Sequence, residues 1–210
     1  MIRVLIADDH SLIREGFKKI ISREVDLKVV GEAQNSNEVL QFLSRNECDV
    51  IVLDISMPEK SGLDLLSELG EYYGRIAVLI LSMHPEERFA IRALKAGASG
   101  YITKERAPEE LVQAIRKIHK GGKYITSTLA EKLAMNIGRD AEKLPHERLS
   151  NREFQVFLSL AMGKPVAEIA KELFLSQSTI NTYRARIFDK MNMNNHSELI
   201  HYAIRNKLID

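Results

Sequence analysis

Polar side chains stand at the ends of four short apolar runs in this sequence. Asp8 and Asp9 follow the first run, Asp54 ends another, and Ser82 and Lys104 follow two more. In open α/β sheets the carboxyl ends of the parallel strands form the ligand-binding edge. The sequence therefore predicts one site that holds three carboxylates, a hydroxyl and an ammonium group.

These groups are suited to the transfer of a phosphoryl group. Three converging carboxylates repel one another unless a cation lies among them, and oxygen ligands favour Mg²⁺, with Mn²⁺ as the second choice. Beside such an ion, Asp54 is placed as a carboxylate nucleophile toward phosphorus. Lys104 is expected to pair with the phosphoryl oxygens, and Ser82 to donate a hydrogen bond. The product would be an aspartyl phosphate.

An alternation of strands and helices up to about residue 120 must position these groups. Short apolar runs between amphipathic segments indicate βαβ units, and hence an α/β doubly wound parallel five-stranded domain. The predicted strands are residues 3–7, 28–33, 49–53, 76–81 and 100–103. The predicted helices are residues 12–22, 36–45, 62–69, 86–95 and 108–119.

The rest of the chain is predicted to form a second, all-α domain. A polar stretch around residues 138–146 has no hydrophobic period, which indicates a linker. We therefore expect one domain over residues 1–120, a linker with a helix (129–137) over 121–146, and a four-helix domain over 147–210. Ser150 and Glu153 have the spacing of a capping box. The segments 166–173 and 176–191 have the proportions of a helix-turn-helix unit.

The predicted helix over residues 176–191 has one apolar and one polar face. Ile180, Tyr183, Ile187 and Met191 recur at helical spacing. The opposite face and its flanks carry Ser178, Asn181, Thr182, Arg184, Ala185, Arg186 and Asp189. Such a surface fits a DNA major groove, where arginine reads guanine and asparagine reads adenine. On spacing alone, a helical bundle for protein contacts is an equally good interpretation.

Composition narrows the class of protein. No apolar stretch of the 210 residues is long enough to cross a bilayer, and no signal-peptide pattern precedes the first strand. The single cysteine, Cys48, cannot form an internal disulfide, which is typical of a reducing cytosol. We expect a cytoplasmic protein without a membrane partner. The formal net charge of +1 does not by itself indicate a nucleic-acid partner.

The first 120 residues resemble the receiver domain of bacterial response regulators. The matching residues are Asp8, Asp9, Asp54, Met57, Pro58, Gly62, Ser82, Ala96, Gly97, Ala98, Tyr101 and Lys104. The resemblance implies that a sensor histidine kinase phosphorylates Asp54. It implies Mg²⁺ ligation by Asp9, Asp54 and the backbone carbonyl of Ser56, with Asp8 contributing directly or through water. On phosphorylation the Ser82 hydroxyl would turn toward the phosphoryl group and the Tyr101 ring would swing inward. A plain core aromatic is the alternative role for Tyr101.

The C-terminal segment closely resembles the LuxR-type DNA-binding domain. The matching residues are 149–153, Gly163, Lys164, 168–170, Leu175, Ser176, Thr179, Ile180, Lys190 and Met191. Together the two halves resemble the NarL/FixJ family of transcriptional response regulators, and residues 182–184 are weakly similar to its BvgA- and EvgA-like branch. The resemblance implies a transcription factor rather than an enzyme, with at most slow Mg²⁺-dependent autophosphorylation and autodephosphorylation at Asp54. The implied partners are promoter DNA with a two-fold site, RNA polymerase and a second copy of the chain.

The same resemblance implies roles for residues of the second domain. The base-reading positions fall on Asn181, Thr182 and Ala185, of which Ala185 can contact only a thymine methyl group. Phosphate contacts would come from Lys164, Ser178, Thr179, Arg184, Arg186 and Lys190, and the affinity should fall with salt. Dimerisation would use Leu199, Ile200 and Ala203 of the last helix. From the residues alone, that helix could equally cover the core.

Other functions stay open from the sequence. An Mg²⁺-dependent phosphohydrolase would form the same aspartyl phosphate. Haloacid-dehalogenase-type enzymes, however, carry both acids as an Asp-x-Asp pair, whereas Ile55 and Ser56 follow Asp54 here. A pure interaction module would require a second domain that shows no salt-sensitive DNA binding. A histidine metal site at His10 or His84 is another alternative, although loop packing is the simpler role for both.

Overall fold

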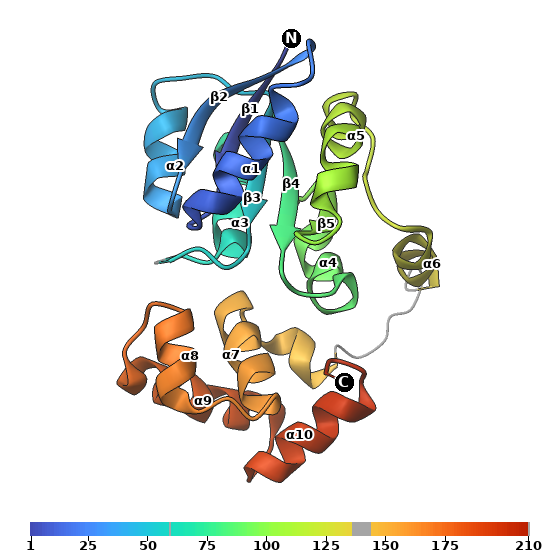
Figure 1. Cartoon of the computed structure of the whole chain (residues 1–210). Coiled ribbons are helices and arrows are strands. Elements are labelled where there is room, and N and C mark those ends of the chain that lie inside the picture. The colour runs from blue at the N-terminus through green and yellow to red at the C-terminus, as the bar shows by residue number, and fades with distance from the viewer. Residues whose placement is uncertain (59, 136–143, 210) are drawn as a thin grey trace. The chain divides into compact units, whose positions relative to one another are not determined.

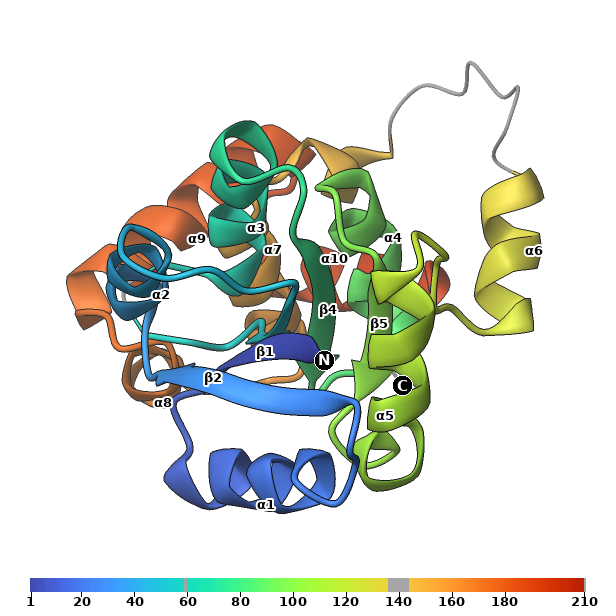
Figure 2. The ribbon, with the colours of Figure 1, turned by 90° about the horizontal axis from the view of Figure 1, so that it is seen from above.

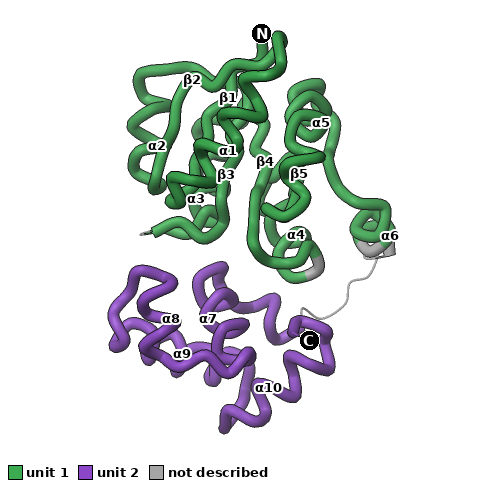
Figure 3. Tube along the Cα trace, in the orientation of Figure 1, with its two compact units in different colours: residues 1–137 green, residues 138–210 purple. Residues whose placement is uncertain are grey.

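The computed structural model describes residues 1–58, 60–135 and 144–209, and the chain divides into two compact units (Figure 3). The first unit spans residues 1–137 and the second spans residues 138–210. The predicted helix end at residue 137 and the predicted linker residues 138–143 lie outside the described residues. The bounds expected for the two domains and the linker stay predictions.

The first unit contains a parallel sheet of five strands. They are β1 (Ile2–Ala7), β2 (Leu27–Ala33), β3 (Val50–Asp54), β4 (Ala77–Ser82) and β5 (Gly100–Thr103), in the spatial order β2-β1-β3-β4-β5. Every end of a predicted strand lies within one residue of the observed end. The strand order changes direction between β1 and β3, which is the point where open sheets of this kind bind ligands.

Helices cover both faces of this sheet (Figure 1, Figure 2). Helices α1 (Ser11–Ile21) and α5 (Ala107–His119) lie on one face, and α2 (Ser36–Leu43), α3 (Gly62–Tyr72) and α4 (Glu86–Lys95) lie on the other. Phe17 of α1 and Leu111 of α5 are buried in one apolar cluster with strand residues such as Val4 and Val52. The predicted α/β doubly wound class is confirmed.

A sixth helix, α6 (Ser127–Met135), follows this βα series. It begins two residues before the predicted start at residue 129. The segment that leads into it is joined to the sheet, because Tyr124 forms a parallel bridge with Gly100 of β5.

The second unit is helical throughout its regular structure, as predicted. It consists of the short 3₁₀ helix η1 (Pro145–Arg148) and of α7 (Asn151–Ala161), α8 (Val166–Glu172), α9 (Gln177–Met191) and α10 (His196–Arg205). The predicted capping box is present: the Ser150 hydroxyl accepts the N–H of Glu153, and the Glu153 carboxylate accepts the N–H of Ser150 at 2.7 Å. The helix-turn-helix is formed by α8 and α9, and Ile180 and Ile187 of α9 are fully buried.

The turn between α8 and α9 holds an unusual residue. Phe174 has a φ of 55° and a side chain that is 57% exposed. A left-handed conformation costs a non-glycine residue about 1 kcal/mol, and an exposed ring loses little packing when it is removed. We expect Phe174→Gly to raise the free energy of unfolding of the second unit by up to about 1 kcal/mol, measured by urea denaturation. Leu175→Gly, next in the turn, is the control and should destabilise; a loss in both variants would contradict the assignment of strain.

Among residues 1–58, 60–135 and 144–209, no helix combines the length and the apolar character that a membrane crossing requires.

Candidate functional site

The register of the parallel strands brings the predicted site residues to one edge of the sheet. Ala7 lies opposite Leu53, and Asp54 lies opposite Leu81. Ser82 lies opposite Thr103, the residue before Lys104. The side chains that end β1, β3, β4 and β5 therefore stand at the same level, as the sequence predicted.

Asp54 and Asp8 share one ammonium group. Nζ of Lys104 lies 2.7 Å from Oδ2 of Asp54 and 2.6 Å from Oδ2 of Asp8. All three side chains are almost completely shielded from water. The other Asp54 oxygen, Oδ1, accepts the N–H of Ser56 at 3.1 Å. Asp54 is thus held on both oxygens by groups that can equally bind a phosphoryl oxygen.

Burial and charge set the protonation of this cluster. Burial raises the pKa of Asp54, and the charge of Asp8 raises it further, against the opposing charge of Lys104. Burial alone would lower the pKa of Lys104, but Asp54 and Asp8 together raise it. Lys104 therefore stays charged, while two buried carboxylates compete for it.

A glycine lets the chain pass close to the Asp54 backbone. A Cβ at Gly62 would lie 2.1 Å from the carbonyl oxygen of Asp54, well inside van der Waals contact. The Gly62 N–H donates to the carbonyl of Ile55 at 3.0 Å. The loop between β3 and α3 is thereby folded back against the end of β3, which fixes the position of Asp54.

The carboxylates also form a cluster that could hold a metal ion. Asp8, Asp9, His10 and Asp54 each offer a ligand atom, and these atoms lie within 4.8 Å of one another. Oδ2 of Asp8 and Oδ1 of Asp9 are buried. Among the described residues, Oδ2 of Asp8 lies 2.6 Å from Nζ of Lys104 and Oδ1 of Asp9 lies 2.8 Å from Nδ1 of His10, and neither oxygen has a further hydrogen-bond partner. A divalent cation would bind both oxygens and reduce the repulsion between the carboxylates, so the residues present fit the predicted ion.

His10, the residue before α1, lies beside this cluster. Its Nδ1 lies 2.8 Å from Oδ1 of Asp9 and 3.2 Å from Oδ1 of Asp8. The two roles considered for His10, loop packing and metal ligation, stay predictions.

The two predicted switch residues meet at one loop. The Ser82 hydroxyl accepts the N–H of His84 at 3.0 Å, and the Tyr101 hydroxyl donates to the carbonyl of His84 at 2.9 Å. Tyr101 is only 2% exposed. Its ring already occupies the inward position that the resemblance assigns to the phosphorylated form, because its hydroxyl finds a backbone acceptor there.

The outer face of α9 is open, as a DNA-reading surface requires. Asn181, Thr182 and Ala185 are exposed, and so are Ser178, Arg184 and Arg186; Thr179 is half-buried. The Thr182 hydroxyl donates to the carbonyl of Ser178 at 3.0 Å, so it is left to act as an acceptor. Within the described part of the chain, neither Arg184 nor Arg186 forms an ion pair.

Both lysines that are predicted to bind DNA phosphates already have partners. Lys164 lies 2.6 Å from an oxygen of Glu172, and Lys190 lies 2.7 Å from an oxygen of the buried Glu153. A phosphate contact by Lys190 would have to compete with that pair. The sequence did not show this, because Lys190 lies 37 positions after Glu153 in the chain.

The predicted dimer contact needs a correction. Leu199 and Ala203 are completely buried, on the helix that packs against α7 in the second unit. They cannot meet a second copy unless α10 leaves its own domain, and they serve as core residues instead. Only Ile200 of the predicted set is partly exposed, and Ile204, one turn further on, is 51% exposed.

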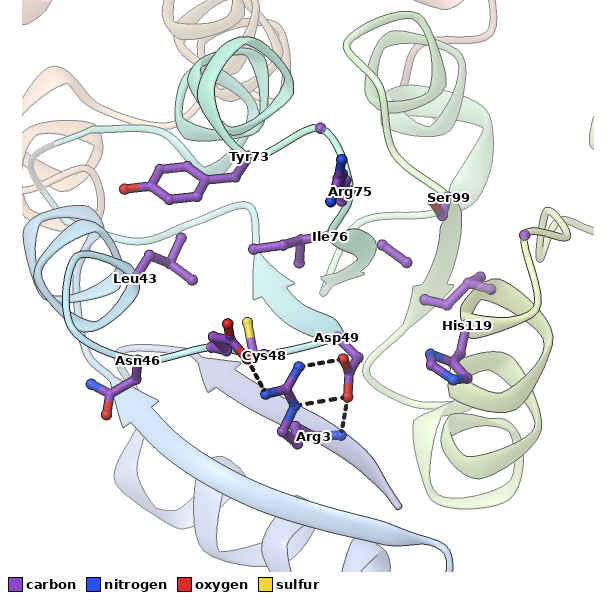
Figure 4. Close-up of a pocket in the computed structure, with 15 residues that line it drawn as sticks. Arg3, Leu43, Asn46, Cys48, Asp49, Tyr73, Arg75, Ile76, Ser99 and His119 are labelled. Carbon is purple, nitrogen blue, oxygen red and sulfur yellow. Dashed lines mark hydrogen bonds and ion pairs between the residues drawn. The ribbon is translucent and has the colours of Figure 1, made fainter.

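A cavity of about 670 Å³ lies at the opposite edge of the sheet, where the strands begin (Figure 4). Its lining includes Cys48, Arg75 and His119. Cys48 is 6% exposed, and burial raises the pKa of its thiol to about 12. Arg3 and Asp49, drawn in contact in Figure 4, are ion-paired at 2.8 Å. None of the predicted phosphoryl-transfer residues lines this cavity.

The Arg3–Asp49 pair gives the first unit a defined acid dependence. Hydrogen bonds from Arg3 lower the pKa of Asp49 from 3.8 to about 2. Its stabilising contribution is therefore complete above pH 3.8 and is lost as the pH falls through about 2.

Because the Arg3–Asp49 pair is partly exposed, we expect Asp49→Asn to lower the free energy of unfolding at neutral pH by about 1 kcal/mol. Denaturant curves between neutral pH and about pH 2 should show the difference from wild type shrinking with acid, and a constant difference would contradict this origin.

Two family models match the chain. The response regulator receiver domain matches residues 4–116, and the model for bacterial regulatory proteins of the luxR family matches residues 147–203. Among curated relatives, response regulator UvrY of Escherichia coli strain K12 is 37% identical over 209 residues, which cover 99% of this chain and 96% of UvrY. Response regulator GacA of Pseudomonas aeruginosa is 36% identical over 211 residues, which cover 100% and 99%. The oxygen regulatory protein NreC of Staphylococcus carnosus is 35% identical over 215 residues, which cover 99% of each.

Solved structures extend this similarity to the architecture. RcsB of Salmonella typhimurium matches with a TM-score of 0.70 and 27% identity, over 98% of both chains. A second RcsB structure, bound to promoter rprA in the presence of the phosphomimetic BeF3⁻, matches with a TM-score of 0.64 and 27% identity, over 96% of this chain and 98% of RcsB. The chain therefore belongs to the NarL/FixJ family of two-component response regulators, and it joins a receiver domain to a LuxR-type DNA-binding domain.

Proposed function

We propose that a sensor histidine kinase phosphorylates Asp54 and that the aspartyl phosphate controls binding of α9 to promoter DNA. The observation that carries the proposal is the buried Asp54 carboxylate, held by Lys104 beside Asp8. An oxygen of Asp54 forms the new bond to phosphorus while the bond to the histidine nitrogen of the kinase breaks. The Lys104 ammonium group can then exchange its ion pair with the Asp54 carboxylate for one with the phosphoryl oxygens.

Mg²⁺, or Mn²⁺ in its place, is the proposed cofactor. Asp9, Asp54 and the carbonyl of Ser56 would hold it, with Asp8 directly or through water. The bound ion would neutralise charge that develops on the phosphoryl oxygens. Slow phosphorylation of Asp54 by small phosphate donors and slow hydrolysis of its acyl phosphate are the only enzymatic activities proposed.

The output is proposed to be transcription, in the cytoplasm. The RcsB neighbour is bound to a promoter in the presence of a phosphomimetic, which supports the same role for this chain. A homodimer would place two α9 helices on a two-fold site, and RNA polymerase would be the next partner. Asn181, Thr182 and Ala185 would face the bases; Ser178, Thr179, Arg184, Arg186, Lys164 and Lys190 would contact phosphates.

The experiment is DNA binding by the full chain, at several salt concentrations, with Mg²⁺ and with or without beryllofluoride. The DNA is the sequence that the protein selects from a random pool. Each lost phosphate contact lowers the slope of log affinity against log salt by about 1. The double variant Arg184→Ala/Arg186→Ala should therefore bind more weakly, with a slope smaller by about 2.

Arg205→Ala, which removes an exposed arginine from α10, is the matched control. It should keep the slope of the wild type. An unchanged slope in the double variant would rule out these phosphate contacts. If the wild type showed no salt-sensitive DNA binding, the alternative function, a module for protein interactions only, would be favoured.

A further inference from the structure

Helix α6 is joined to the start of α4 through one carboxylate. Glu86, the first residue of α4, accepts the Thr126 hydroxyl at 2.6 Å and the Thr126 N–H at 3.3 Å. The oxygen of that same hydroxyl accepts the N–H of Leu129, in the first turn of α6, at 3.2 Å. Thr126 is thus the N-cap of α6, and Glu86 holds the cap. A carboxylate in this place also suits the positive end of the helix dipole.

The segment before α6 is tied to the strand that carries Tyr101. The carbonyl of Tyr124 accepts the Tyr101 N–H at 3.1 Å, and the Tyr124 N–H donates to the carbonyl of Ser99 at 2.9 Å. Leu129 of α6 is only 2% exposed. Among the described residues, three features therefore attach α6 and the segment before it to the receiver fold: a backbone pairing, the buried Leu129 side chain and the Glu86 carboxylate.

Glu86 is close in sequence to the loop that contacts two residues of the proposed phosphoryl-transfer site, Ser82 and Tyr101. The Ser82 hydroxyl accepts the His84 N–H, and the Tyr101 hydroxyl donates to the His84 carbonyl. Pro85 alone separates His84 from Glu86. A change at Ser82 must therefore pass through a loop of three residues before it reaches the group that caps α6.

We propose that Glu86 is the positioning residue through which the state of the Asp54 site reaches α6. The inference rests on the proposed phosphorylation of Asp54. When the Ser82 hydroxyl turns toward a phosphoryl oxygen, the His84 N–H loses that acceptor and the loop rearranges. Glu86 is displaced from Thr126, and the N-cap of α6 weakens. Since α6 has nine residues, and helices this short depend on their tertiary contacts, it opens more often.

Hydrogen–deuterium exchange of residues 127–135 in the full chain tests this, with Mg²⁺ and with or without beryllofluoride. Loss of an N-cap should speed exchange in the wild type by about fivefold when beryllofluoride is added. Glu86→Ala and Thr126→Val should exchange fast in both conditions and show no further response. Glu109→Ala removes an exposed carboxylate from the first turn of α5, and it should behave as the wild type does.

The beryllofluoride adduct is read separately by its fluorine resonances. An adduct in the wild type without a change in α6 exchange would overturn the inference and leave the phosphorylation site intact. A response of α6 that persists in Glu86→Ala would overturn it as well. Absence of the adduct in the wild type would overturn the proposed function and the inference together.

Discussion

Asp54→Asn is expected to abolish phosphoryl transfer to the chain and to stabilise the first unit in Mg²⁺-free buffer. The amide nitrogen and oxygen of asparagine fill the same space, but they cannot form an acyl phosphate. The stability effect follows from the raised pKa of Asp54, which burial and the charge of Asp8 cause. A folded state that prefers the protonated acid loses stability as the pH rises past the pKa of the unfolded chain. The neutral asparagine side chain does not ionise, so the variant does not lose this stability as the pH rises.

Two measurements check this result. Labelling by radioactive acetyl phosphate, or by a partner kinase, should vanish in Asp54→Asn and persist in Glu105→Gln, which changes an exposed carboxylate next to Lys104. Calorimetry without Mg²⁺ should show a higher unfolding midpoint for Asp54→Asn, by about 4 °C for each kcal/mol gained. Added Mg²⁺ should then stabilise the wild type more than the variant. Persistent labelling of the variant would place the phosphoacceptor elsewhere.

Lys104→Met should have the opposite effect on stability, and a large one. Its ammonium is the buried counter-ion of both Asp8 and Asp54, and only 5% of the side chain is exposed. Removal of one partner from a buried ion pair typically costs 3 kcal/mol or more, so we expect a loss of about 3 kcal/mol near neutral pH. The loss should shrink in acid, because a buried carboxyl can then take up a proton in place of its lost partner.

Denaturant unfolding with and without Mg²⁺ measures this effect. Millimolar Mg²⁺ should restore part of the lost stability, because a cation among the carboxylates replaces the missing charge. Lys120→Met, which changes an exposed lysine after α5, is the control and should alter stability by less than about 0.5 kcal/mol. Equal stability of Lys104→Met and wild type at neutral pH would mean that the carboxylates are not ionised together.

The position of the candidate phosphoryl-transfer residues was predictable because the ends of the strands determine it. Buried strands alternate with helices, and the residue that ends each strand must lie at the carboxyl edge. Asp54, Ser82 and Lys104 could therefore be placed together from sequence spacing alone. The register that aligns Asp54 with Leu81 gives the same arrangement. The resemblance then added roles that spacing could not supply.

What the sequence could not supply were the contacts between side chains far apart along the chain. The ion pair between Lys190 and Glu153 joins α9 to α7, and no local sequence pattern predicts this contact. For Leu199 and Ala203, periodicity located an apolar face of α10 correctly, but it could not tell whether the domain's own core or a second copy covers that face. For Tyr101, the resemblance implied a switch role, whereas the direction of its ring depends on the carbonyl of His84.

The buried thiol of Cys48 makes this chain convenient for labelling. Thiol reagents attack the thiolate, and a pKa of about 12 leaves almost none of it at neutral pH. With no other cysteine in the sequence, the wild type should carry no background label. One added cysteine, for example Ala134→Cys on the exposed side of α6, would accept a fluorophore or spin probe at a single known place. The wild-type chain then serves as the unlabelled control, and Cys48 does not have to be replaced first.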